Sequence, residues 1–337
     1  MKFFVRCTRS FSIELILITS SFGSVLNARS IHNSLTAVST LRESPASDHF
    51  VKVDGLRIHY VESGSGRTVV LIHGNAGSVE DFEGRTLSLL STHYRVLAID
   101  RPGHGRSDRP ARNASVEFQA DLLHHTLSIL GISDPILVGH SWGAALALAY
   151  ALRYPSEVSA MVLLAPAAYP DDSGDGLLRT ATRVPLIGDL TLLLGKVLVG
   201  RHMLKAALAR AFSPQPVSDR YFRIANSMWL DRKHLKAYVE DEASLNDSLK
   251  RMSKRYSEIS VPVIIVTGDK DKIVSPEQNA IALHKVLPVS ELIEMKDKGH
   301  EIPQTDPETI DVAVNMLSRE TFESLLWFGS RHLRSQD

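Results

Sequence analysis

The sequence holds a single cysteine, Cys7, among its 337 residues. One thiol cannot form an internal disulfide, and it cannot build the cysteine cluster of a structural zinc site. An excess of one charge is also absent, because 38 Lys and Arg residues balance 38 Asp and Glu residues. No global field therefore draws the chain toward nucleic acid or an anionic membrane surface, and we expect no nucleic-acid partner.

A long membrane-spanning stretch is absent too. The apolar stretch near the N-terminus, residues 11–26, is shorter than the ~20 residues that a span needs. Basic residues precede it and the small residue Ala28 follows it, which is the order of a secretory signal peptide. We expect residues 1–28 to direct export, with an uncleaved N-terminal anchor in contact with a membrane as the alternative. Residues 29–48 are rich in Ser and lack periodicity, so they are interpreted as a linker.

Apolar strand patterns alternate with helical patterns through most of the remaining chain. The expected strands are residues 50–53, 56–61, 68–72, 94–99, 135–138, 158–164, 261–266 and 290–295. Asp54-Gly55, between the first two, predicts a hairpin turn. The expected helices are residues 79–90, 115–130, 144–154, 276–287 and 306–322. This alternation predicts an α/β fold with a mostly parallel sheet flanked by helices, built from residues 49–169 and 261–325.

The alternation stops between residues 170 and 260, where no buried strand pattern occurs. Helical runs cover residues 186–199, 202–212 and 219–227 instead. A helical insertion between two strands of one sheet is interpreted as a cap over a substrate site. Its Leu-rich run, residues 190–194, is expected to pack on the core, with a lipid-facing surface as the alternative.

The segment Gly139-His140-Ser141-Trp142-Gly143 stands between an apolar strand and a helix of small residues. It has the pattern G-x-S-x-G of a nucleophile elbow, in which a serine occupies a tight, strained turn between strand and helix. Glycine is needed on both sides because a side chain there would separate the strand from the helix. Ser141 is therefore the candidate nucleophile.

A serine hydroxyl needs a neighbouring base, and in a parallel sheet the chemistry lies at the carboxyl ends of the strands. Among fourteen histidines, His300 is the one in a loop directly after the final expected strand. The orienting acid should follow a strand between the serine and the histidine in chain order. Asp271 is preferred over Asp269, because Asp269 adjoins a glycine turn. Asp171 and Asp172 are the less favoured alternatives.

Acyl transfer also needs two backbone N–H groups that bind the developing oxyanion. One comes from the residue after the nucleophile, and the other from the loop after an earlier strand. The residue after the nucleophile is Trp142, and the earlier loop is His73-Gly74-Asn75. We therefore expect the N–H groups of Asn75 and Trp142 to form the oxyanion hole.

Together these pieces resemble the α/β-hydrolase superfamily over residues 50–324. The matching segments, in the family's order, are His73-Gly74-Asn75, Asp100-Arg101-Pro102-Gly103-His104-Gly105-Arg106-Ser107, Gly139-His140-Ser141-Trp142-Gly143, Gly268 with Asp271, and Gly299-His300. The resemblance implies a triad of Ser141, Asp271 and His300 beneath a cap made by residues 170–260. The most similar subgroups are capped esterases and lipases, cofactor-free haloperoxidases and carbon–carbon bond hydrolases.

Similar dehalogenases and epoxide hydrolases carry Asp where this chain has Ser141. An aspartate that attacks saturated carbon forms an ester that water can cleave, whereas a serine would form an ether that water cannot. The expected reaction is therefore hydrolysis of a small-molecule ester with a small to medium acyl chain, through an acyl-enzyme and without metal or cofactor. Carbon–carbon bond hydrolysis, haloperoxidase-like activity and ligand binding without catalysis are the alternatives.

Overall fold

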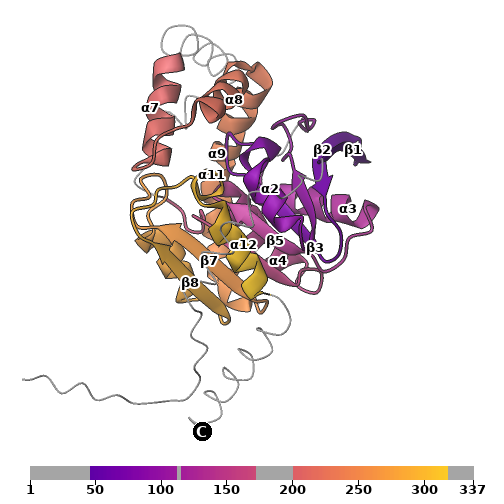
Figure 1. Cartoon of the computed structure of the whole chain (residues 1–337). Coiled ribbons are helices and arrows are strands. Elements are labelled where there is room, and N and C mark those ends of the chain that lie inside the picture. The colour runs from indigo at the N-terminus through magenta and orange to yellow at the C-terminus, as the bar shows by residue number, and fades with distance from the viewer. Residues whose placement is uncertain (1–45, 112–114, 172–199, 318–337) are drawn as a thin grey trace, which may run out of the picture. The chain divides into compact units, whose positions relative to one another are not determined.

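The computed structural model describes residues 46–111, 115–171 and 200–317 (Figure 1). The expected signal peptide, nearly all of the expected linker, the alternative acid Asp172, the helical run at residues 186–199 and the end of the expected helix beyond residue 317 lie outside these residues. In the described part of the chain, no helix combines the length and the apolar character needed to cross a membrane.

An eight-stranded sheet forms the centre of the described chain. Its strands are β1 (Ser47–Val53), β2 (Leu56–Ser63), β3 (Thr68–Ile72), β4 (Arg95–Ile99), β5 (Ile136–His140), β6 (Ala160–Leu164), β7 (Val263–Gly268) and β8 (Ser290–Met295). They lie in the order β1-β2-β4-β3-β5-β6-β7-β8. The pairs β1–β2 and β2–β4 are antiparallel, and the other pairs are parallel. The expected α/β fold with a mostly parallel sheet is confirmed.

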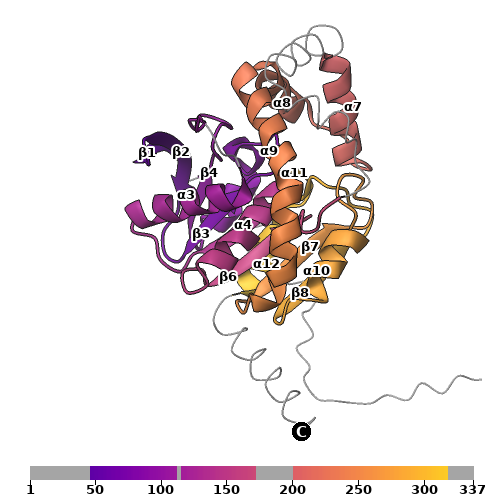
Figure 2. The ribbon, with the colours of Figure 1, turned by 180° about the vertical axis from the view of Figure 1, so that it is seen from behind.

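Helices cover both faces of this sheet, as the view from behind also shows (Figure 2). On one face, α3 (Val116–Ile129) and α4 (Trp142–Arg153) pack with the C-terminal end of α9 (Arg232–Met252). On the other face, α2 (Arg85–Leu90) packs with α12 (Pro307–Met316). The two short helices α10 (Ala282–His284) and α11 (Ile302–Thr305) flank β8 in the chain.

The strands contribute alternate residues to the two hydrophobic cores. In β3, Val70 and Ile72 join the core beside α3 and α4, whereas Val69 and Leu71 join the core beside α2 and α12. All of these side chains are buried. A strand covered on both faces is a continuous apolar run in the sequence, and this run is the signal that predicts these strands.

The hairpin expected around Asp54 and Gly55 is present. Val53 pairs with Leu56, and the two turn residues have φ angles of 50° and 83°, as the tightest hairpin turns require. Strand β1 begins at Ser47, so the expected linker, which extends to residue 48, overlaps the start of the sheet. The serine-rich composition does not reveal this boundary, because the pairing with β2 decides it.

The expected helix at residues 79–90 is two elements in the structure. A short 3₁₀ helix, η2 (Val79–Asp81), precedes α2, and Gly84 between them has a φ of 83°. A residue in that conformation cannot continue a right-handed helix. The chain therefore changes direction at Gly84 and starts α2 afresh.

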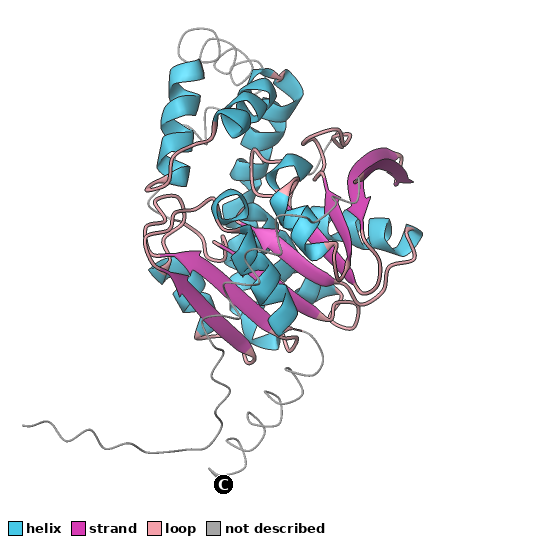
Figure 3. Cartoon of the chain, viewed as in Figure 1, coloured by secondary structure: helices cyan, strands magenta, loops and turns pink. Residues whose placement is uncertain are grey.

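Between β6 and β7 the described residues form helices and loops without a strand (Figure 3). Helices α7 (Gly200–Phe212) and α8 (Asp219–Leu230) share a small hydrophobic core of their own that includes Leu204 and Tyr221. The long helix α9 follows, and it has no counterpart among the helical runs expected from the sequence. It contacts α8 as well as α3 and α4, so it connects this helical segment with the sheet.

Asp100 organises the loop at the carboxyl end of β4. Its side chain is buried and accepts hydrogen bonds from the backbone N–H groups of Val79 and Arg106, both at 2.8 Å. Its Oδ2 also lies 2.6 Å from Nδ1 of His59. Asp100 therefore connects η2, β2 and its own loop.

Asp100→Asn should lower the free energy of unfolding by about 1.5–3 kcal/mol, because hydrogen bonds to a charged group are lost and an NH₂ group then faces a backbone N–H. Urea unfolding measures this change. Asp108→Asn is the control in the same loop: its side chain is 37% exposed and the amide oxygen can keep the bond to the N–H of Arg57. Equal losses in the two variants would contradict this role for Asp100.

Candidate active site

Ser141 lies at the turn between β5 and α4, with a φ of 52° and a ψ of −113°. A non-glycine residue in this region is strained, and such residues persist where the surrounding structure holds them. The N–H of Ser141 donates to the carbonyl of Leu164 in β6 at 2.9 Å. The expected tight, strained turn is therefore what the structure shows at this residue.

The two glycines of the elbow allow a very close approach of chain segments. A Cβ atom on Gly139 would lie 2.4 Å from the carbonyl oxygen of Gly143, within the elbow itself. A Cβ atom on Gly143 would lie 2.3 Å from the carbonyl oxygen of Ile72, at the end of β3. Glycine at both positions is thus needed for packing α4 against β5 and β3.

His300 and Asp271 meet across the loops that follow β8 and β7. Nδ1 of His300 lies 2.7 Å from Oδ2 of Asp271, and both side chains are almost fully buried. The other carboxylate oxygen of Asp271 accepts from the N–H groups of Ile273 and Val274, so the carboxylate is held at both oxygens. The alternative acid Asp269 is exposed and pairs with Lys270 at 2.9 Å instead.

The contact between His300 and Asp271 raises the pKa of the histidine and lowers the pKa of the aspartate. Burial lowers the pKa of His300, but the hydrogen bond to Asp271 and the charge of that carboxylate raise it, and the net shift is upward. Burial raises the pKa of Asp271, but the hydrogen bond and charge of His300, with the two backbone N–H groups, lower it overall. Asp271 therefore stays ionised, and its partner stays oriented with Nδ1 protonated.

The sequence-predicted site residues line one cavity of about 520 Å³. They are Asn75, Ser141, Trp142, Asp271 and His300. Trp142 is the first residue of α4, where the helix offers no internal acceptor for its N–H. In the part of the chain that is described, no cluster of His, Cys, Asp or Glu has the arrangement of a metal site.

His140 is a neighbour of the site whose position the sequence did not indicate. It is buried, its ring centre lies 4.9 Å from that of His300, and its Nε2 lies 3.0 Å from the carbonyl oxygen of His300. Burial and the neighbouring His300 lower the pKa of His140 to about 3. The neutral ring therefore donates from Nε2 to that carbonyl and holds the His300 backbone.

A family model described as alpha/beta hydrolase fold matches residues 67–307. The chain belongs to the α/β-hydrolase family. The segments matched include β3 to β8 and every sequence-predicted site residue of this α/β hydrolase.

Known relatives of this α/β hydrolase include enzymes named for different reactions. A 2-hydroxy-6-oxononadienedioate/2-hydroxy-6-oxononatrienedioate hydrolase from Klebsiella pneumoniae is 29% identical over 266 residues, covering 76% of this chain and 90% of that protein. Lipase 1 from Psychrobacter immobilis is 28% identical over 269 residues, covering 76% of this chain and 79% of that protein. Among solved structures, Cfl2 from Burkholderia cenocepacia is similar with a TM-score of 0.70 and 27% identity, covering 82% of this chain and 97% of that one.

Asp271→Asn should lower kcat of this hydrolase by about four orders of magnitude, because the amide neither fixes the imidazole tautomer nor stabilises its charged form. Steady-state hydrolysis of a chromogenic substrate measures the loss. Asp269→Asn is the matched control, since Asp269 is exposed and two residues away in the same loop. A larger loss in the Asp269 variant would show that Asp269, and not Asp271, is the orienting acid.

The pH profile should show an acid limb whose inflection lies above 6.5, the ordinary pKa of histidine. As the expected base, His300 must be unprotonated, so we expect kcat/KM to fall as the pH falls through the raised pKa of His300. The variant Asp271→Asn lacks the carboxylate charge that raises the pKa of His300. We therefore expect the inflection in the pH profile of its residual activity to move to lower pH. An acid limb that stays in place in this variant would show that another group controls it.

Proposed function

We propose that this α/β hydrolase cleaves carboxylic esters of small to medium acyl chains through an acyl-enzyme at Ser141. The observation that carries the proposal is the meeting of a strained serine, a buried His–Asp pair and the Asn75 and Trp142 segments at one cavity. A serine nucleophile favours attack on a carbonyl carbon, because the acyl-serine that forms can be hydrolysed.

The proposed reaction begins when Oγ of Ser141 attacks the ester carbonyl and passes its proton to Nε2 of His300. The carbonyl oxygen becomes an oxyanion, which the N–H groups of Asn75 and Trp142 stabilise. The C–O bond to the alcohol then breaks, and the proton on Nε2 goes to the departing oxygen. Water, deprotonated by His300, attacks the acyl-serine in the same way and releases the acid.

The charges around the cavity favour a neutral substrate over a dianionic one. Besides Asp271, the acidic residues that line the cavity are Asp171, Glu242 and Glu301, and burial raises the pKa of Glu301. The basic side chains among its described lining residues, Arg210 and Lys272, belong to exposed residues. A dienedioate, which carries two carboxylates, would find no buried cation there, so we favour an ester over the carbon–carbon bond substrate of the Klebsiella relative.

The size of the substrate is proposed from the helices that close the cavity. Apolar side chains of α7 and α9 form part of its wall, namely Leu204, Leu208, Leu245 and Leu249. A cavity of about 520 Å³ lies within the usual range for small-molecule sites. We therefore propose that the segment between β6 and β7 acts as a cap that favours short to medium acyl chains. We also propose that residues 1–28 direct export, because basic residues, an apolar stretch and a small residue follow one another there.

Ser141→Ala should lower ester hydrolysis by about a million-fold while the protein stays folded, since loss of a nucleophilic serine removes the whole covalent route. A panel of p-nitrophenyl esters from acetate to laurate measures the rates, and urea unfolding checks the fold. We expect wild-type kcat/KM to peak at a short or medium chain, without a jump in rate when the substrate forms an emulsion.

A 2-hydroxy-6-oxo-dienedioate serves as the competing substrate, and its absorbance reports carbon–carbon cleavage. Faster turnover of this compound than of every ester would replace the proposed function with carbon–carbon bond hydrolysis. Sharp activation on emulsified long-chain triglyceride would instead identify a lipase. Tight binding of esters without turnover would favour a binding protein.

A further inference from the structure

The guanidinium of Arg101 lies behind the predicted oxyanion hole, although Arg101 does not line the cavity itself. Arg101 follows β4 and is 2% exposed. Its Nε donates to the carbonyl of His73 at 3.1 Å, and a terminal nitrogen donates to the carbonyl of Gly74 at 3.0 Å. Its guanidinium carbon lies 4.0 Å from the centre of the Trp142 ring. Arg101 thus contacts both segments that supply the predicted oxyanion donors.

The carbonyl of Gly74, which accepts from Arg101, also accepts a hydrogen bond from the side chain of His73. Nε2 of His73 accepts from the backbone N–H of Arg101 at 2.9 Å, so the proton of the neutral ring is on Nδ1. Nδ1 lies 2.8 Å from the carbonyl oxygen of Gly74 and donates to it. Burial and the positive charge of Arg101 hold the pKa of His73 well below its ordinary value, which keeps the ring neutral.

The peptide bond between Gly74 and Asn75 links these hydrogen bonds to the predicted oxyanion donor. The carbonyl of Gly74 and the N–H of Asn75 belong to the same planar unit, and in a trans peptide they point in opposite directions. Donors that hold the carbonyl toward Arg101 and His73 therefore hold the N–H of Asn75 away from them. A charged donor at the carbonyl also polarises the peptide, which strengthens its N–H as a hydrogen-bond donor.

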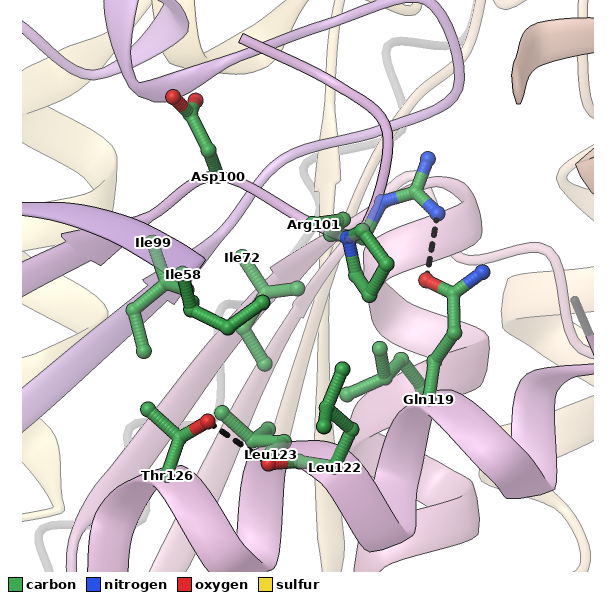
Figure 4. Close-up of a pocket in the computed structure, with 11 residues that line it drawn as sticks. Ile58, Ile72, Ile99, Asp100, Arg101, Gln119, Leu122, Leu123 and Thr126 are labelled. Carbon is green, nitrogen blue, oxygen red and sulfur yellow. Dashed lines mark hydrogen bonds between the residues drawn. The ribbon is translucent and has the colours of Figure 1, made fainter. Parts of the chain in front are cut away.

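Helix α9 supplies the carboxylate that holds Arg101 in place. Asp241 has no exposed surface, and it accepts from Arg101 at 2.6 Å and from Arg109 at 2.8 Å. Gln119 connects the pair: its Oε1 accepts from Arg101 (Figure 4), and its Nε2 donates to Asp241 at 3.1 Å. Burial raises the pKa of Asp241, but the charge of Arg101 and the hydrogen bond from His104 lower it, and the net shift is downward.

The same helix holds the oxyanion loop at a second point. The side-chain Nδ2 of Asn75 donates to the carbonyl of Tyr238 at 3.1 Å and to Oε2 of Glu242 at 3.3 Å. Both residues belong to α9, on either side of Asp241 in the chain. One stretch of α9 therefore fixes the Asn75 side chain directly and the Gly74–Asn75 peptide through Arg101.

We propose that Arg101, held by Asp241 of α9, is a positioning residue that aims the N–H of Asn75 at the oxyanion. The inference rests on the proposed acyl transfer at Ser141. It makes α9 a structural component of the oxyanion hole, in addition to a wall of the cavity.

Arg101→Lys tests this role because lysine keeps the charge but lacks the planar fork that reaches Gly74 and Asp241 together. Misplacing one group by about 1 Å costs about 100-fold in rate, so we expect kcat/KM to fall by about that factor, through kcat rather than KM. The acid limb of the pH profile should stay in place, since His300 and Asp271 are untouched.

A pair of ketones separates oxyanion binding from general binding. An alkyl trifluoromethyl ketone reacts with Ser141: Oγ bonds to the carbonyl carbon, the proton passes to His300, and the carbonyl oxygen becomes an oxyanion. The matching methyl ketone binds without forming this adduct. We expect Arg101→Lys, and in the same direction Asp241→Asn, to weaken inhibition by the trifluoromethyl ketone about 100-fold and to leave the methyl ketone unchanged.

Arg109→Lys is the control, because Arg109 contacts the same carboxylate but neither His73, Gly74 nor Trp142. In Arg109→Lys, the ratio of the inhibition constants for the trifluoromethyl ketone and the methyl ketone should equal the wild-type ratio. This holds even if urea unfolding shows that the variant is less stable. Arg101→Lys protein that is folded and keeps the wild-type ratio, or that loses affinity for both ketones equally, would overturn the proposal.

The ketone pair also distinguishes this inference from the proposed function. Wild-type protein that forms the trifluoromethyl ketone adduct but hydrolyses no ester would overturn the ester proposal alone, and the ratio in Arg101→Lys would still decide the role of Arg101. Failure of the wild type to form an adduct at Ser141 would overturn both.

Discussion

Parallel pairing of β3, β5, β6, β7 and β8 is the constraint on which the site depends. Strands that run in the same direction place the loops after them at one edge of the sheet. Asn75 follows β3, Ser141 follows β5, Asp271 follows β7 and His300 follows β8. A shift of one strand by one residue would displace its loop by about 3.3 Å, which is more than a hydrogen bond tolerates. The register of the sheet therefore sets the geometry of the site.

The strained turn at Ser141 is stable because the sheet holds it on several sides. Its left-handed backbone costs about 1–3 kcal/mol. The N–H of Ser141 bonds to Leu164, and its carbonyl accepts from Ala144 and Ala167. These bonds tie the turn to β6 and to the first turn of α4, and the glycines of the elbow let the segments approach closely enough to form them.

The buried charges around Asp241 show how a helix outside the sheet becomes part of the site. Arg101, Arg109 and Asp241 are close together and largely removed from water. Removing one charge of such a group leaves another uncompensated, at a cost of about 3–5 kcal/mol. Through Arg101, which also donates to the carbonyls of His73 and Gly74, the group holds α9 and the loops after β3 and β4 together. Asn75, one of the two predicted oxyanion donors, lies in the loop after β3.

The sequence by itself determined the elements whose signal is local. Continuous apolar runs marked the buried strands, Asp54-Gly55 marked the hairpin, and glycines around Ser141 marked the strained turn. Chain order and the position after a strand predicted His300 and Asp271 as base and acid, and the two side chains meet because parallel sheets bring such positions to one edge. The sequence did not reveal the break at Gly84 or the start of β1 at Ser47, where a backbone conformation and a strand partner decide the boundary.

Only the tertiary structure decided which distant side chains meet. Asp241 stands between Glu240 and Glu242 in α9, yet its side chain is fully buried against Arg101, which stands 140 residues earlier in the chain. His140 likewise becomes a support for His300 only because β5 and the loop after β8 lie side by side. Local patterns report burial along one helix or strand, whereas the pairing of buried polar groups depends on packing between elements far apart in the sequence.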